Sequence, residues 1–190
     1  MSNWPLLSVL IWLPILGGAL VLALGNARAG AARWLGFAVA VLTFVFSLGL
    51  LSGFDYANPG LQFIESHAWI PSFDIHYNLG ADGIAVALLL LNTLITVLTL
   101  AGAWGSVNKR VAQYVAAFLI LEGLTNGIFA ASDAVLFYVF FEAMLIPMFL
   151  IIGVWGGPRR IYASLKFFLY TFLGSVLMLV GLVYLYIKGG

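Results

Sequence analysis

The chain has 190 residues, of which 64% are hydrophobic and only 8% are charged, and its formal net charge is +1. This composition is typical of a membrane protein and excludes both a separate soluble domain and binding to nucleic acid through a basic surface. The sequence contains no cysteine, which excludes disulfides, thiolate metal sites and cysteine nucleophiles within it, and we predict no metal site.

Six hydrophobic segments reach the length of about twenty residues that a helix needs to cross a bilayer. We therefore predict an all-α, polytopic membrane protein with a single membrane domain over residues 1–190, an external loop at 53–79 and transmembrane helices near 4–25, 32–52, 80–103, 112–131, 134–155 and 163–187. The first segment is not a signal peptide, because Arg28 and Arg33 follow it, whereas a signal peptide has its basic residues before the apolar stretch.

Basic residues gather in alternate connections of the predicted bundle. They follow the first, third and fifth helices, as Arg28, Arg33, Lys109, Arg110, Arg159 and Arg160. The other two connections carry the acidic residues Asp55, Glu65, Asp74, Asp82 and Asp133. The positive-inside rule then places the basic loops in the cytoplasm and both chain ends outside, with Lys188 as the single opposing residue.

The external connection at 53–79 contains two turn signals, Asn58-Pro59-Gly60 and Ile70-Pro71-Ser72, with short β-branched and aromatic stretches between them. This pattern predicts a small β-hairpin that forms an extramembrane lid. His67 and His76 lie in it without the spacing of a metal-binding motif, so we interpret both as solvated loop residues. We expect Asp82 to stabilise the N-terminus of the third helix through the helix dipole.

Polar residues inside the third and fourth helices fall into rows. Asn92, Thr96 and Thr99 are spaced i, i+4 and i+7, so they share one helix face, and we expect that face to turn away from lipid. In the fourth helix Glu122 precedes Asn126 by four residues, and the pair Gly123 and Gly127 has the GxxxG spacing that permits close helix packing. Glu122 is therefore either a proton carrier or a hydrogen-bonding residue at a helix contact.

The fifth helix contains Glu142 near the middle of its apolar run. A charged residue at this depth costs at least ~2.5 kcal/mol on insertion scales, so such residues usually serve a function. Tyr138 precedes it by one turn and is placed to donate a hydrogen bond, and Pro147 removes the amide that would bond the Ala143 carbonyl. The loosened turn is a candidate water site. The alternative is a permanently protonated or salt-bridged acid that holds helices together.

Lys166 lies at the start of the sixth predicted helix, shortly after the basic pair Arg159 and Arg160. Its side chain is long enough to reach the membrane interface, where it would serve as an anchor. Tyr170 and Gly174 continue its helix face, so it is also placed to point along a polar interior. We therefore regard Glu142, Glu122 and Lys166 as the candidate proton relay residues.

Three stretches of the sequence resemble subunit M of bacterial respiratory complex I, the counterpart of mitochondrial subunit 4. They are FYVFFEAMLIPMFLIIGVWGGPRRIYASLKFFLYTFLGSVLML at 137–179, LEGLTNGIFAASDAVLFY at 121–138 and LGADGI at 79–84. The resemblance implies the N-terminal part of an antiporter-like helix bundle that moves protons across the membrane. It also implies that Glu142 corresponds to the essential acid of the fifth helix and that Glu122 corresponds to the glutamate of the fourth.

The resemblance further implies that this chain carries no cofactor of its own, and that NADH, FMN, iron–sulfur clusters and quinone belong to other subunits. The implied partners are the other membrane subunits of complex I, the lipid bilayer and protons, and the implied location is the bacterial inner membrane. Members of the family have about fourteen helices, with a lysine partner of the glutamate on a broken seventh helix. We therefore expect residues 1–190 to contain an incomplete half-channel that does not pump protons alone.

Two other functions fit the same helix plan. A subunit of a multisubunit cation/proton antiporter would share the helices and the acid, although AMLIPM at 143–148 and WGGPRR at 155–160 look closer to complex I. A non-transporting scaffold subunit would also be hydrophobic and six-helical. The scaffold reading predicts that the buried acids are replaceable, so substitution at Glu142 separates it from the transport reading.

Overall fold

Six long helices and one β-hairpin make up the described part of the computed structural model, which comprises residues 5–58, 60–70 and 75–189. The helices are α1 (Leu6–Leu24), α2 (Ala29–Gly53), α3 (Gly83–Gly102), α4 (Val111–Ala130), α5 (Ala134–Trp155) and α6 (Arg160–Gly189), with a short 3-10 turn, η1 (Asn26–Arg28), before α2. All six are long and apolar enough to cross a membrane, which confirms the predicted class. Pro59, Pro71, Ser72 and Asp74 lie outside the described residues.

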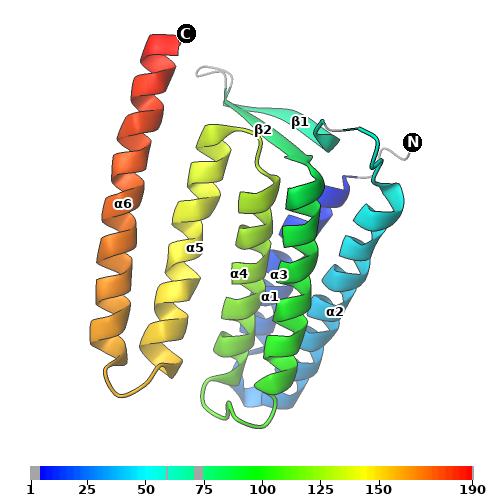
Figure 1. Ribbon diagram of the computed structural model, residues 1–190. Coiled ribbons are helices and arrows are strands. Elements are labelled where there is room, and N and C mark those ends of the chain that lie inside the picture. Colours follow the sequence, from blue (N-terminus) through cyan, green and yellow to red (C-terminus); the bar gives the residue numbers. More distant parts are fainter. Residues whose placement is uncertain (1–4, 59, 71–74, 190) are drawn as a thin grey trace.

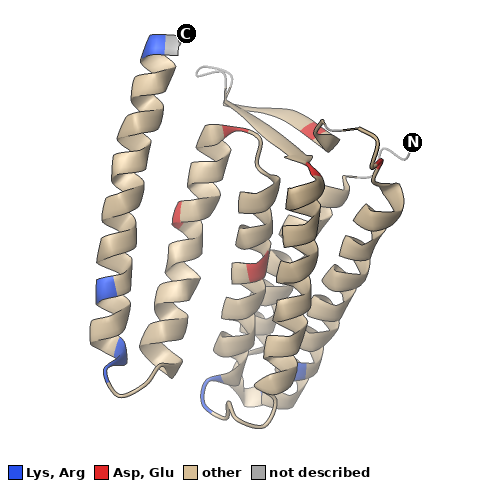
Figure 2. Ribbon diagram, viewed as in Figure 1, with Lys and Arg blue, Asp and Glu red and all other residues tan. Residues whose placement is uncertain are grey.

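The helices alternate in direction, and the hairpin lies across the end of the bundle at which α3 and α5 begin (Figure 1). α1 packs most extensively on α4, whereas α6 lies at the outer edge and packs chiefly on α5. Basic residues gather at the end opposite the hairpin, and most acidic residues lie near the hairpin (Figure 2). This is the charge separation that the sequence predicts.

The core consists of two hydrophobic clusters that lie near opposite ends of the bundle. The cluster beneath the hairpin is formed by Leu7, Leu10, Ile11, Leu50, Leu79, Ala81, Val86, Leu89, Ala130, Leu136 and Phe140. The cluster near the basic loops is formed by Val21, Ala32, Ala40, Leu100, Val111, Ala112, Val115, Ala116 and Leu119. Neither cluster contains a buried residue of α6, so the two clusters are formed by α1–α4, the hairpin and the first two turns of α5.

Two glycines let neighbouring helices approach α4 closely. A Cβ at Gly123 would overlap the Ile11 carbonyl of α1, and a Cβ at Gly127 would meet the Phe140 ring of α5 at 2.7 Å. Both separations are shorter than van der Waals contact, so a larger residue would push the helices apart. The predicted role of this GxxxG pair in packing is confirmed, and the two glycines serve different neighbours.

The hairpin consists of β1 (Gln62–Ile70) and β2 (Ile75–Ala81), which pair in antiparallel register with Glu65 opposite Leu79. The predicted hairpin is confirmed, but the predicted start of the third helix at residue 80 is wrong. Strand β2 continues to Ala81, which pairs with Gln62, and α3 begins only at Gly83. Residues 79–81 are apolar, so hydropathy assigns them to the helix that follows. Their partners in the β-ladder lie 14 to 19 residues earlier in the chain, and hydropathy does not reveal that pairing.

The hairpin is fastened to the bundle. The Glu65 carboxylate accepts hydrogen bonds from the backbone N–H of Leu7 at 2.8 Å and of Ser8 at 3.2 Å, and from the Ser8 hydroxyl. These donors lie in the first turn of α1, where helix N–H groups lack partners within the helix and where the dipole favours an anion. On the other strand, the Asn78 carbonyl accepts from the Ser132 amide at 3.0 Å. The predicted extramembrane lid is therefore bound to the end of the helix bundle by hydrogen bonds from both of its strands.

Acidic side chains also begin two of the later helices. Asp82 accepts from the Ala85 amide at 2.7 Å at the start of α3, which confirms its predicted role. Asp133 accepts from the Val135 and Leu136 amides at 2.9 Å at the start of α5. At the basic end α6 begins at Arg160, directly after the Gly-Pro turn, rather than at residue 163 as predicted.

Candidate functional site: Glu122 and Glu142

Glu122 and Glu142 both lie in the interior of their helices, away from the helix ends. Glu122 lies eight residues before the end of α4 and Glu142 eight residues after the start of α5, so each is about 12 Å along its helix from the turn that joins them. Each helix has one acidic residue, visible as a single red band on its ribbon, and the band on α5 lies nearer the hairpin than the band on α4 (Figure 2). The two candidate acids therefore lie within the helical part of the bundle at different heights.

The Glu122 side chain is only 1% exposed, and neither of its carboxylate oxygens has a hydrogen-bond partner among the described residues. The backbone around it is held firmly. The side-chain amide of Asn92 donates to the backbone carbonyl of Glu122 at 3.1 Å and to the side-chain oxygen of Asn126 at 2.8 Å. The side-chain amide of Asn126 donates to the backbone carbonyl of Leu10 at 2.9 Å. This network joins α1, α3 and α4 and leaves the carboxylate itself unpaired.

A cavity of about 400 Å³ adjoins Glu122 between α3, α4, α5 and α6. Its polar lining consists of Asn92, Thr96, Thr99, Glu122, Thr125 and Thr171, and its apolar lining of Ile95, Phe118, Leu121, Phe141, Met144, Met148 and Phe167. The predicted polar face of the third helix does turn inward, because all three of its residues line this cavity. The contributions of α5 and α6 were missed, since nothing in the spacing of their residues shows which face meets α3 and α4.

Glu142 lies in a different environment. One of its carboxylate oxygens is buried without a hydrogen-bond partner in the described part of the chain. The Tyr138 hydroxyl lies close enough to this carboxylate for a side-chain hydrogen bond, as predicted, and also close enough to the Ser175 hydroxyl on α6. Ser175, only 3% exposed, donates to the Phe172 carbonyl at 2.8 Å. Its proximity was missed because a lone serine in an apolar helix carries no pattern.

Glu142 is not among the described residues that line the cavity beside Glu122. Its neighbours Phe141 and Met144 do line that cavity. The side of α5 that faces the cavity beside Glu122 is therefore not the side that carries Glu142. Helix α5 runs unbroken from Ala134 to Trp155 with Pro147 inside it. Pro147 itself is buried, and the water site that we predict at the loosened turn stays a prediction.

Lys166 is exposed, and its ammonium lies 5.8 Å from the ring centre of Tyr162 and 5.7 Å from that of Tyr170. Both aromatic residues belong to the outward face of α6. Phe167 and Thr171, which follow Lys166, are the α6 residues that line the cavity beside Glu122. The structure therefore places Lys166 beside neither acid, and the role of Lys166 in a relay stays a prediction.

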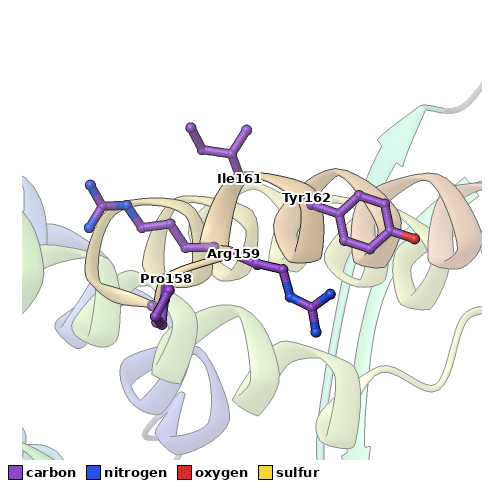
Figure 3. A pocket seen from close by; sticks show the side chains of 7 residues that line it. Pro158, Arg159, Ile161 and Tyr162 are labelled. Atoms are coloured by element: carbon purple, nitrogen blue, oxygen red, sulfur yellow. The ribbon is translucent and has the colours of Figure 1, made fainter.

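A shallow surface hollow of about 630 Å³ lies at the turn between α5 and α6, lined by residues 156–162. The side chains of Pro158, Ile161 and Tyr162 spread to different sides of the turn and do not converge on a common point (Figure 3). No acidic residue lines this hollow. The described residues also include no group of three or more His, Cys, Asp or Glu that could hold a metal ion. The two carboxylates on α4 and α5 thus remain the candidate site.

Comparison with known proteins identifies relatives of the chain. The family described as "NADH:quinone oxidoreductase/Mrp antiporter, TM" matches residues 131–190. Over 97% of its length, the chain is 52% identical to NADH-quinone oxidoreductase subunit M of Rhodobacter capsulatus, covering 36% of that protein. By sequence, the chain is similar over nearly its whole length to part of NADH-quinone oxidoreductase subunit M. The protein of the same name from Rickettsia prowazekii is 39% identical over 99% of the chain, which covers 39% of it.

The fold agrees with this similarity. A chain in the structure of respiratory complex I from Thermus thermophilus with bound NADH matches 93% of this chain with a TM-score of 0.79 and 32% identity. This chain covers 35% of that chain and spans between about a third and two fifths of the curated relatives named above. The family match at 131–190 includes Glu142 and Lys166, and Glu122 lies outside it.

Proposed function

We propose that this chain is part of a proton-translocating, antiporter-like membrane subunit of NADH:quinone oxidoreductase. In this proposal, quinone reduction on other subunits is coupled to proton transfer through Glu142 and Glu122. The observation that carries it is the pair of acids on α4 and α5: three of their four carboxylate oxygens are buried without a hydrogen-bond partner in the described part of the chain. An acid retained only to join helices would be paired, because an unpaired buried charge is costly.

The partners and location follow from the relatives. The named relatives are subunits of an oxidoreductase, so we assign NADH, FMN, iron–sulfur clusters and quinone to other subunits and expect this chain to contact membrane subunits and lipid. The basic loops lie together at one end of the bundle (Figure 2). The positive-inside rule then supports a bacterial inner membrane protein with these loops in the cytoplasm and its N-terminus outside.

A cation/proton antiporter subunit is the second candidate, because the matching family is described by both names. The identity of 52% to an oxidoreductase subunit over nearly the whole chain favours the first proposal. Co-purification of the tagged chain with flavin- and iron–sulfur-containing subunits would support the oxidoreductase. Co-purification with membrane subunits only would support the antiporter.

Substitution of Glu142 in the full-length subunit, within its assembled complex, tests the proposal. Glutamine retains the size of a protonated glutamate but cannot release a proton. We expect Glu142→Gln to abolish proton-gradient formation and Glu142→Asp to retain part of it. Glu122→Gln should cause a smaller loss, because the packing at Gly123 and Gly127 survives it. Quinone reductase turnover and proton uptake, normalised to assembled complex, are the measurements, and full pumping by an assembled Glu142→Gln complex would favour the scaffold role.

A further inference from the structure

A groove of about 420 Å³ runs along the outside of the bundle between α1, α4 and α5. Its lining is apolar except near one end and includes Leu22 of α1, Ile120 of α4, and Ile146 and Leu150 of α5. Leu22, Ile146 and Leu150 are exposed, so the groove opens outward. Among the described residues it shares no lining residue with the cavity between α3, α4, α5 and α6, so the two are separate.

The groove is about as long as one leaflet of a bilayer is thick. Ile120 lies nine residues from the basic end of α4, and Ile146 lies nine residues from the basic end of α5, so each is about 14 Å from that end. Half of the hydrocarbon core of a bilayer is about 15 Å thick. The groove therefore extends from the membrane surface on the side of the basic loops to a depth near the bilayer centre.

The groove is also narrow. Its volume of about 420 Å³, spread over about 14 Å, gives a mean cross-section of about 30 Å². A helix with its side chains is about 10–12 Å across, so its cross-section is about three times larger. A single hydrocarbon chain, whose carbon neighbours lie at about 4 Å, fits this width. The shape therefore favours a lipid acyl chain over a helix of another protein.

Arg110 lies at the mouth of the groove, directly before α4. Its guanidinium group has no hydrogen-bond or ion-pair partner among the described residues, and no described acidic residue lines the groove. Arg33 at the same end of the bundle differs, because it donates to the Val107 carbonyl at 2.6 Å and to the Asn108 side chain at 3.1 Å. Gln113 also lines the mouth and adds an amide donor. The mouth therefore offers hydrogen-bond donors and a positive charge to an anion.

Aromatic residues place this mouth at the level of the lipid headgroups. Trp34 and Trp104 pack edge to face near the basic end, with 4.9 Å between their ring centres. Trp155, which lines the groove, donates from its indole N–H to the Lys109 carbonyl at 3.0 Å. Tryptophan is enriched at membrane–water interfaces, where its ring lies at headgroup depth. Arg110, the next residue after Lys109, therefore lies at the depth of the lipid phosphates.

We propose that the groove binds an anionic phospholipid, with one acyl chain along its apolar walls and the phosphate paired with Arg110. An arginine guanidinium suits a phosphate because it donates two parallel hydrogen bonds. A lipid with a net negative charge is favoured over a zwitterionic one, because the cation of a zwitterionic headgroup competes with Arg110 for the phosphate. The bound lipid holds α1, α4 and α5 together at the basic end. The site does not depend on the function proposed above.

The first experiment compares an anionic lipid with a neutral one at the groove. The chain contains no cysteine, so Ile146→Cys supplies a single site for a fluorescent label. Leu169→Cys is the matched control outside the groove, because Leu169 also lies nine residues from the basic end of its helix and is 62% exposed, compared with 61% for Ile146. Each labelled 190-residue chain is reconstituted in phosphatidylcholine vesicles with a minor fraction of either brominated phosphatidylglycerol or brominated phosphatidylcholine. Bromine quenches only a label that it touches.

We expect brominated phosphatidylglycerol to bind beside Ile146 about fivefold more tightly than brominated phosphatidylcholine, as one basic residue near an anionic lipid would give. At Leu169 the two lipids should quench the label alike. Equal quenching by the two lipids at Ile146 would overturn the anionic site.

Substitutions of basic residues then test the role of Arg110. Arg110→Gln should remove the preference for phosphatidylglycerol at Ile146, whereas Arg110→Lys keeps the charge and should retain most of it. Arg159→Gln removes an exposed charge from the same end of the bundle, outside the groove, and should leave the preference unchanged. A preference that survives Arg110→Gln, or that falls equally in Arg159→Gln, would overturn the site, because the lipid would then be attracted to the basic end as a whole.

The same label in the assembled complex tests which molecule fills the groove. Brominated phosphatidylglycerol added to the reconstituted complex should again quench the label at Ile146 more strongly than brominated phosphatidylcholine. Quenching by neither lipid would show that a protein segment fills the groove, and that result would overturn the proposal.

Discussion

Helices α1–α4 and helices α5–α6 are packed very differently. Half of the membrane-spanning window of α4 is buried, compared with 22% for α5 and 6% for α6. Glycines on α4 lie in contact with α1 and α5, whereas a Cβ at Gly174 or Gly181 of α6 would meet nothing within 4 Å. The densest packing thus lies around α4, and α6 is held mainly through α5.

This difference separates the two candidate acids. Glu122 lies in the close-packed part, where Asn92 and Asn126 fix the surrounding backbone by hydrogen bonds to two neighbouring helices. Glu142 lies where the packing is sparse, beside Tyr138 and the Ser175 hydroxyl of α6. Glu122 is therefore surrounded by hydrogen-bonded neighbouring helices, whereas the surroundings of Glu142 depend on how α5 and α6 lie against each other.

Adding one methyl group to a glycine should have opposite effects in the two regions. Gly123→Ala places a Cβ against the Ile11 carbonyl and the Ile15 side chain, and such overpacking should destabilise the 190-residue chain by about 1–3 kcal/mol. Gly174→Ala, the matched control, should leave stability unchanged or raise it by up to about 1 kcal/mol, because alanine favours helix and meets no neighbour. Unfolding in mixed micelles, followed by circular dichroism, measures both. Equal losses at the two sites would contradict the contrast in packing.

Hydrophobic length was sufficient to predict all six helices, because each must supply an uninterrupted apolar run of membrane-spanning length. Periodicity was sufficient to predict that Asn92, Thr96 and Thr99 share an inward face. Contacts between distant segments could not be predicted in this way. The bonds from Glu65 to the start of α1 join residues 57 and 58 positions apart, and the contribution of Thr171 to the cavity depends on how α6 lies against α5.

Removal of the cap that Glu65 provides should destabilise the close-packed region by a smaller amount than Gly123→Ala. Glu65→Ala leaves the first N–H groups of α1 without their acceptor, which typically costs about 0.5–2 kcal/mol. His67→Ala is the matched control on the same strand, because His67 is exposed. Hydrogen exchange at Leu7 and Ser8 should rise in Glu65→Ala and remain unchanged in His67→Ala. If both variants protect these amides like the original chain, the hairpin is not fastened through Glu65.

The smallest effect should come from Lys166, on the exposed face of the sparsely packed region. Its contacts with Tyr162 and Tyr170 lie near the limit of about 6 Å for cation–π attraction and are solvent-exposed. We expect Lys166→Gln to change the stability of the 190-residue chain by no more than about 0.5 kcal/mol. If Lys166 only anchors α6, Lys166→Gln should also retain proton pumping in the assembled complex, and no part of the described structure places the ammonium beside either acid. Loss of pumping at unchanged stability would instead make Lys166 a member of the relay, and it would show that α6 presents this face to a proton path that the packing of α1–α5 does not define.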